Sequence, residues 1–152
     1  MADIATQLTE DLKDAMRQKD AIRRTVIRSL RSAIHNQEIE DHKELDDDGA
    51  IRVLAKQAQQ RRDSIEAFGL AERDDLVQKE KAELAIILGY LPQQLTPDEV
   101  TEIVRSSIEQ VGAQGPQDMG KVMGAIMPLV RGKAEGREVN RIVTEILKGM
   151  GD

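Results

Sequence analysis

The sequence predicts an all-α protein made of two helical bundles. Apolar residues recur at helical spacing along most of the chain, and 39% of the 152 residues are hydrophobic, which is enough to bury a core. Phe68 and Tyr90 are the only aromatic residues, so the core must come from aliphatic residues and methionine, which favour packed helices over a β-sandwich. We expect an N-terminal bundle of about four helices over residues 1–91 and a three-helix C-terminal bundle over residues 96–149.

Composition restricts the compartment and the class of ligand. The chain has no cysteine, which excludes a disulfide framework and thiol catalysis. Its first residues lack the basic and apolar segments of a signal peptide, and its longest apolar run, Ala85–Leu88, is far too short to span a bilayer. We therefore expect a cytoplasmic protein with no membrane contact. A net charge of −6 argues against a general nucleic-acid binder and against a DNA partner, so any anion site must be local.

Two amphipathic helices are predicted to open the chain. The first carries an apolar stripe from Ile4 to Ala15, and the second follows Asp20 with a stripe from Ile22 to Ile34. The second helix also has a charged face, spaced by 4, 3, 4, 3 and 4 residues: Arg24, Arg28, Arg31, His35, Glu38 and His42. This face is either solvated and balanced by acidic neighbours, or a basic groove for RNA or an acidic partner. No metal is expected there, because the two histidines lack a further strong ligand.

A second helical hairpin is predicted after a charged break at residues 41–49. The aspartates of the break cap the next helix instead of forming a calcium loop, because the twelfth loop position is Ala55 and not glutamate. In that helix Arg61 interrupts the apolar stripe, and an interior arginine needs a carboxylate partner. The fourth helix carries Glu80 and Glu83 on its apolar stripe, so Arg61 or Arg62 should pair with one of them.

The boundaries of the remaining helices follow from glycine, proline and capping residues. Gly69 and residues 72–75 should separate the third and fourth helices, and Pro92 should end the first bundle. Thr96 and Glu99 have the spacing of a capping box, with Pro97 at the first helical position. The fifth helix should stop at Gly112 and the last one, with its stripe from Val139 to Leu147, at Gly149.

The segment from Asp118 to Val143 has a composition unlike the rest of the chain. Gly120 and Gly124 lie four residues apart where a helix should begin, although glycine costs a helix about 0.5–1 kcal/mol relative to alanine. Either a ligand approaches the backbone there or a neighbouring helix packs closely against it. Basic residues surround the glycines: Lys121, Arg131, Lys133, Arg137 and Arg141. The match to a phosphate-binding loop from Gly115 to Lys121 fails at Val122, but a helix N-terminus capped by Asp118 can still accept a phosphate.

Several motifs together resemble a known family. Residues 119–124 (Met-Gly-Lys-Val-Met-Gly), the turn at residues 132–136 and residues 139–143 are similar to the tail domain of GatB, the large component of the glutamine-dependent aspartyl/glutamyl-tRNA amidotransferase. Upstream, Arg28 with Leu30, residues 60–65 and the Tyr-Leu-Pro at 90–92 resemble the free-standing YqeY-like proteins, a group expected to be bacterial, that share this tail. One departure is Glu135, where the family pattern suggests the shorter aspartate.

The resemblance implies a link to tRNA-dependent amidation, in which a carbon–nitrogen bond is made with glutamine as the amide donor. There the tail domain contacts tRNA. Carried over by position, the nucleic-acid-binding residues are Gly120, Lys121, Gly124, Lys133, Arg137 and Arg141. Possible further partners are an amidotransferase or aminoacyl-tRNA synthetase subunit. The catalytic region of GatB has no counterpart here, and we expect no catalytic residue and no cofactor. The alternative is a protein-interaction adaptor with no RNA contact.

Overall fold

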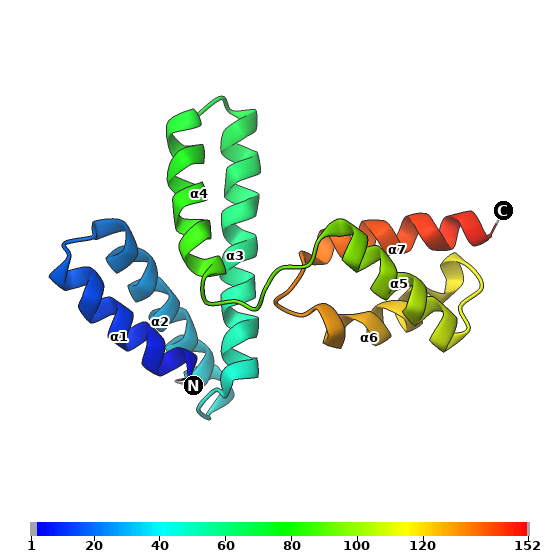
Figure 1. Cartoon of the computed structure of the whole chain (residues 1–152), viewed down its shortest axis with the longest axis horizontal. Helices are drawn as coiled ribbons and strands as arrows, with labels where there is room; N and C mark the ends of the chain where they lie inside the picture. The colour runs from blue at the N-terminus through cyan, green and yellow to red at the C-terminus, as the bar shows by residue number, and fades with distance from the viewer. Residues whose placement is uncertain (1–2, 152) are drawn as a thin grey trace. The chain divides into compact units, whose positions relative to one another are not determined.

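A computed structural model describes residues 3–151, which form seven α-helices and one 3-10 helix and contain no strand (Figure 1). The chain divides into two compact units, Met1–Pro92 and Gln93–Asp152. The first unit contains α1 (Ile4–Arg17), α2 (Ala21–Asp41), α3 (Asp47–Leu70) and α4 (Asp74–Leu88). The second contains α5 (Pro97–Val111), the 3-10 helix η1 (Pro116–Asp118), α6 (Met119–Val130) and α7 (Gly136–Met150). The predicted all-α class, with a four-helix and a three-helix bundle, is confirmed.

The first unit is built from two antiparallel hairpins, α1 with α2 and α3 with α4 (Figure 1). Three of its helices begin at an aspartate whose carboxylate accepts a hydrogen bond from a backbone N–H of the first turn: Asp3 for α1, Asp20 for α2 and Asp46 for α3. The core lies where α2 contacts both α3 and α4, and it includes the fully buried Leu30, Leu54 and Ile87.

Polar contacts also join the helices of the first unit. Arg61 of α3 places Nη2 at 3.6 Å from Glu83 Oε1 of α4 and at 3.4 Å from Ser29 Oγ of α2. The side chains of Arg61 and Glu83 are only 15% and 13% exposed, so this ion pair lies at the edge of the core. The partner of Arg61 is therefore Glu83 and not Glu80. Beyond the end of α4, the Tyr90 hydroxyl donates to Asp11 Oδ2 of α1.

Four local predictions in the two units are wrong. Ile22 is half exposed, because the apolar contact of α2 starts only at Val26. His42 lies beyond the end of α2 in the left-handed region, at φ 57°, so it does not continue the charged face. Gly69 lies inside the last turn of α3, and the chain reverses after it, at residues 71–73. Gly149 lies inside α7, which continues to Met150.

The core of the second unit consists almost entirely of aliphatic side chains. Val104, Val122, Ile126, Val143 and Leu147 are fully buried between α5, α6 and α7. The capping box expected at the start of α5 is present: Glu99 N donates to Thr96 Oγ1, and Thr96 N donates to Glu99 Oε1. At the other end of α5, Gly112 adopts φ 67°, a conformation that glycine accepts without strain. No helix within residues 3–151 combines the length and the apolar character needed to cross a membrane.

Candidate anion-binding surfaces

The glycines of α6 lie on its exposed face. Gly120 and Gly124 are both exposed, and a Cβ atom added at either position would meet no atom within 4 Å apart from its chain neighbours and the adjoining backbone of α6. The opposite face carries Val122, Ile126 and Val130, which are buried against α5 and α7. The explanation that the glycines admit a closely packed helix of the same chain is therefore wrong. They leave α6 with a stretch of accessible backbone that serves no packing contact in the second unit.

Two exposed lysines lie near this face of α6. Lys121, beside Gly120, and Lys133, in the turn after α6, are exposed, and neither forms an ion pair within residues 3–151. The turn itself is fixed: Gln94 Nε2 donates to the Gly132 carbonyl at 2.7 Å, and Leu95 N donates to the Lys133 carbonyl at 2.8 Å. The backbone from which the Lys133 side chain projects is thus held in place.

The arginines of α7 differ from these lysines. Arg141 is held by two carboxylates of its own helix, with Nη2 at 2.8 Å from Glu138 Oε1 and Nη1 at 3.2 Å from Glu145 Oε1. The hydrogen bond from Arg141 to Glu138 and the charge of both glutamates raise the pKa of Arg141. Arg137 is exposed in the first turn of α7. Arg141 is therefore a poor candidate for an RNA contact, although the sequence groups it with the others.

The six predicted nucleic-acid-binding residues do not form one cluster. Lys121 lies in the first turn of α6, whereas Lys133 and Arg137 lie beyond its last turn. At a rise of about 1.5 Å per residue, the twelve residues of α6 separate these two ends by about 18 Å. A ligand that contacts both must be extended, as a nucleic-acid backbone is.

The start of α6 differs from the prediction. Asp118 occupies the N-cap position, but its carboxylate makes no capping bond to α6 and instead accepts a hydrogen bond from Gln114 N at 2.8 Å. The chain enters α6 through the 3-10 helix η1. The expected aspartate cap at this N-terminus is therefore wrong, and Asp118 adds a negative charge near Lys121.

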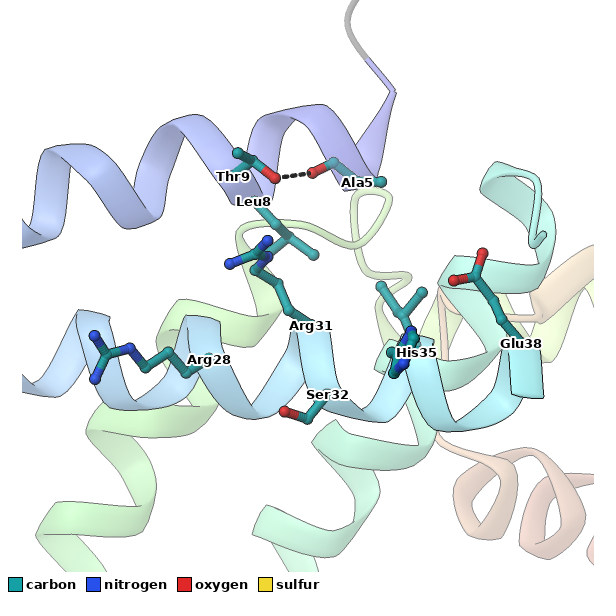
Figure 2. Close-up of a pocket in the computed structure, with 9 residues that line it drawn as sticks. Ala5, Leu8, Thr9, Arg28, Arg31, Ser32, His35 and Glu38 are labelled. Carbon is teal, nitrogen blue, oxygen red and sulfur yellow. Dashed lines mark hydrogen bonds between the residues drawn. The ribbon is translucent and has the colours of Figure 1, made fainter. Parts of the chain in front are cut away.

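A second basic surface lies in the first unit, between α1 and α2. A pocket of about 510 Å³ is lined there by residues of both helices (Figure 2). The α1 side contributes Ala5, Leu8 and Thr9, and the α2 side contributes Arg28, Arg31, Ser32, Ile34, His35 and Glu38. We call the exposed basic residues Arg24, Arg28, Arg31 and His35 the α2 basic row. Its members follow one another along α2, three of them beside the pocket.

Acidic side chains do not pair directly with the α2 basic row in the part of the chain that the structure describes. None of its four residues forms an ion pair within residues 3–151. Glu38 accepts a hydrogen bond from Leu45 N at 2.9 Å and so holds the loop that leads to α3. The expected balance by acidic neighbours is therefore not met by ion pairs, although the row is exposed, as a solvated face is expected to be. A sequence signal for this exists: neither Arg28 nor Arg31 has a carboxylate three or four residues away on α2.

Metal ligands are not brought together in the part of the chain that the structure describes. No group of three or more histidine, cysteine, aspartate or glutamate side chains within residues 3–151 could hold a metal ion. His35 lies on α2, whereas His42 lies outside that helix.

Comparison with known proteins identifies relatives along almost the whole chain. Residues 5–147 match the family model described as Yqey-like protein. The chain is 32% identical over 147 residues to "Altered inheritance of mitochondria protein 41, mitochondrial" of Pyrenophora tritici-repentis, covering 95% of this chain and 81% of that protein. It is 45% identical to the protein of the same name from Lachancea thermotolerans, over 60% of this chain and 49% of that protein. The corresponding Saccharomyces cerevisiae protein (strain YJM789) is 35% identical over 78% of this chain and 68% of its own length.

These relatives correct one expectation and assign the family. They are named mitochondrial proteins, which contradicts the predicted cytoplasmic location. That prediction rested on missing cysteines and missing apolar segments, features that do not distinguish the cytoplasm from other aqueous compartments. The relatives are fungal and give no support to a bacterial source. Because the family model matches far more than half of the sequence, the chain belongs to the YqeY-like family.

Proposed function

We propose that the chain is a non-catalytic, tRNA-associated module whose second unit holds tRNA backbone. The contact surface is the exposed face of α6 with Gly120, Lys121 and Gly124, continued by Lys133 and Arg137. The observation that carries the proposal is the open glycine face of α6. Its two glycines weaken the helix and fill no packing role within their unit, and they lie beside Lys121, which forms no ion pair within residues 3–151.

The proposed contact recognises phosphates and shape, not base sequence. Exposed backbone without Cβ atoms allows a sugar-phosphate chain to approach closely, while lysines neutralise its charge. Lys121 in the first turn of α6 and Lys133 beyond its last turn, on either side of a helix about 18 Å long, suit an extended polyanion. The near absence of aromatic residues argues against recognition of single strands by base stacking. Arg141, which the resemblance also suggests, is left out because two glutamates already hold it.

The link to amidation rests on the resemblance of residues 119–143 to the amidotransferase tail. In this proposal the chain binds tRNA alone or beside an amidotransferase or aminoacyl-tRNA synthetase subunit, and the partner carries out the glutamine-dependent step. No catalytic residue or cofactor is assigned to this chain.

The test is a titration of the purified full chain with total tRNA over a series of salt concentrations. Affinity should fall with salt, because each phosphate contact releases counterions. Lys121→Ala/Lys133→Ala should weaken binding at least about tenfold at low salt. A control variant, Arg105→Ala/Lys148→Ala, removes the same charge from α5 and from the last turn of α7. If both variants lose affinity equally, or if the parent chain does not bind, the proposal is wrong.

A second function is favoured by one observation on the same helix. Leu129 of α6 is 51% exposed, and a large exposed aliphatic side chain on this helix suits contact with a partner helix. In this adaptor function RNA plays no part. Binding to an amidotransferase or synthetase subunit that persists at high salt, survives Lys121→Ala/Lys133→Ala and is lost in Leu129→Ser would support it.

A further inference from the structure

We propose that the groove between α1 and α2 is a docking site for an acidic, amphipathic helix of a partner protein. The site belongs to the first unit, and it is independent of the tRNA contact proposed for the second. Its components are the α2 basic row, an apolar floor between the helices and an exposed apolar side chain toward each end.

The first argument is that the α2 basic row has no carboxylate partner among the described residues. Arg23, on another side of α2, is held by Asp14 of α1 at 3.0 Å. The α2 basic row has no such carboxylate within the described chain, although the protein as a whole carries 28 acidic and 22 basic residues. In an acidic protein, a row of unpaired arginines creates a local positive potential that attracts an acidic ligand.

The second argument is spacing. The α2 basic row runs from Arg24 to His35 at intervals of 4, 3 and 4 residues, and therefore covers about 16 Å along one side of α2. Carboxylates at the same intervals on a second helix would form a row of equal length. Guanidinium groups can bind such carboxylates with two parallel hydrogen bonds.

The third argument is the apolar part of the groove, which favours a helix over RNA. Ala5, Leu8 and Ile34 line the 510 Å³ pocket, and Leu8 and Ile34 are buried. Figure 2 shows Ala5 and Leu8 on the α1 side of the pocket. Ile39, one turn beyond His35 on α2, is 59% exposed. Met16, two turns beyond Thr9 on the same side of α1, is 51% exposed. A phosphate backbone would leave this apolar surface without a partner, whereas the apolar stripe of an amphipathic helix would cover it.

The test uses a synthetic, fluorescently labelled peptide of about 20 residues, long enough to form a helix of several turns. One side of the peptide helix carries leucine, and its flank carries glutamate at intervals of 4, 3 and 4. Two comparison ligands are a scrambled peptide of the same composition, which is not amphipathic, and a poly-uridylate strand of similar charge. Binding to the full chain is measured by fluorescence anisotropy. We expect the amphipathic peptide to bind more tightly than either comparison ligand.

Two pairs of variants locate the site. Arg28→Ala/Arg31→Ala should weaken peptide binding about tenfold. Arg52→Ala/Lys56→Ala removes two exposed charges from α3 and should leave binding unchanged. Ile39→Ala, which keeps every charge, should weaken peptide binding severalfold and leave poly-uridylate binding unchanged. Alanine suits all of these exposed helical positions, so the variants should fold, which far-ultraviolet circular dichroism can verify.

Several results would overturn the proposal. The groove is not a helix site if the amphipathic peptide fails to bind, or if the scrambled peptide binds equally well. Tighter binding of poly-uridylate that depends on Arg28 and Arg31 would assign the groove to RNA instead. If the α2 and α3 double variants weaken peptide binding equally, the peptide responds only to the net charge of the protein and the groove is not its site.

Discussion

The two units present their positive charge in different ways. In the first unit, the α2 basic row forms no ion pair with any described residue and lies beside a pocket lined partly by apolar side chains. In the second, Lys121 and Lys133 lie at opposite ends of a helix whose exposed face is open glycine backbone, and Arg141 is already paired with glutamates. The difference suggests two kinds of ligand, since the first surface combines charge with apolar area and the second combines charge with bare backbone.

The interiors of the two units also differ. In the first unit, the Arg61–Glu83 ion pair and the Tyr90–Asp11 hydrogen bond join helices around the core. The second unit has an almost purely aliphatic interior, in which Ser107 is the one buried polar residue among residues 93–151. Both cores are hydrophobic, and in the first unit the two polar contacts at the core edge add to the specificity of helix pairing.

The largest expected effect tests whether the two cores are separate. Leu54→Ala should lower the free energy of unfolding of the first unit by about 2–5 kcal/mol, and Leu147→Ala should do the same to the second, because both side chains are fully buried. Native-state hydrogen exchange would follow both units at once. Each substitution should reduce protection in its own unit only. Loss of protection in both units from one substitution would contradict two separate cores.

The next effect concerns the polar contacts of the first unit. Glu83→Gln should lower the free energy of unfolding by about 1–3 kcal/mol, because Arg61 would then keep a mostly buried charge without a carboxylate. Glu80→Gln is the matched control on the same helix and should change stability by less than about 0.5 kcal/mol. Urea denaturation measures both values. Equal effects would mean that the Arg61–Glu83 pair has no special role.

At the exposed glycines of α6, substitution is expected to raise the free energy of unfolding instead of lowering it. Gly120→Ala and Gly124→Ala should each stabilise the protein by about 0.5–1 kcal/mol, because a methyl group at either position meets open space. The same changes should weaken tRNA binding by covering the backbone. Gly112→Ala is the control, and it should be destabilising, because Gly112 has a φ of 67°. Stabilisation without any loss of tRNA affinity would separate the glycines from RNA binding.

The smallest effect depends on pH. Tyr90→Phe should cost about 0.5–1.5 kcal/mol near neutral pH, a range that allows for the partial exposure of the hydroxyl. Burial, and then the hydrogen bond to Asp11, raise the pKa of Tyr90 above its usual value of 10.0. The folded protein therefore retains the phenolic proton where the unfolded chain releases it.

The contribution of Tyr90 to stability is consequently complete below about pH 10 and decreases as the pH rises further. Urea denaturation of parent and variant between pH 7 and about pH 11 should show a stability difference that shrinks above about pH 10. A difference that does not change with pH would mean that the Tyr90 hydroxyl makes no such bond.

Much of the fold could be predicted because its signals are local. The capping box at Thr96 and Glu99 depends on residues within one turn, and the pairing of Arg61 follows from one arginine on an apolar stripe. Helix ends were less predictable at Gly69 and Gly149, because tertiary packing carries a helix through a glycine that its local propensity would not favour.

The sites were harder to predict, because the spacing of charges in the sequence suggests which side chains pair but does not settle it, and because the sequence does not show which glycines are exposed. Arg141 has glutamates three residues before it and four residues after it and pairs with both, whereas Lys121 has Asp118 three residues before it and forms no ion pair within residues 3–151. The alternative for Gly120 and Gly124, close packing or an open face, depended on where α5 and α7 lie against α6. The pocket beside the α2 basic row required the side chains of α1, which the charged pattern of α2 cannot supply.

The most direct measurement compares tRNA binding by three proteins across a salt series: the parent chain, Lys121→Ala/Lys133→Ala and Arg28→Ala/Arg31→Ala. The account predicts salt-sensitive binding that falls at least about tenfold in the lysine variant and changes little in the arginine variant, since the α2 basic row serves a protein helix. Loss of tRNA affinity in the arginine variant, with normal affinity in the lysine variant, would contradict it by placing RNA on the first unit.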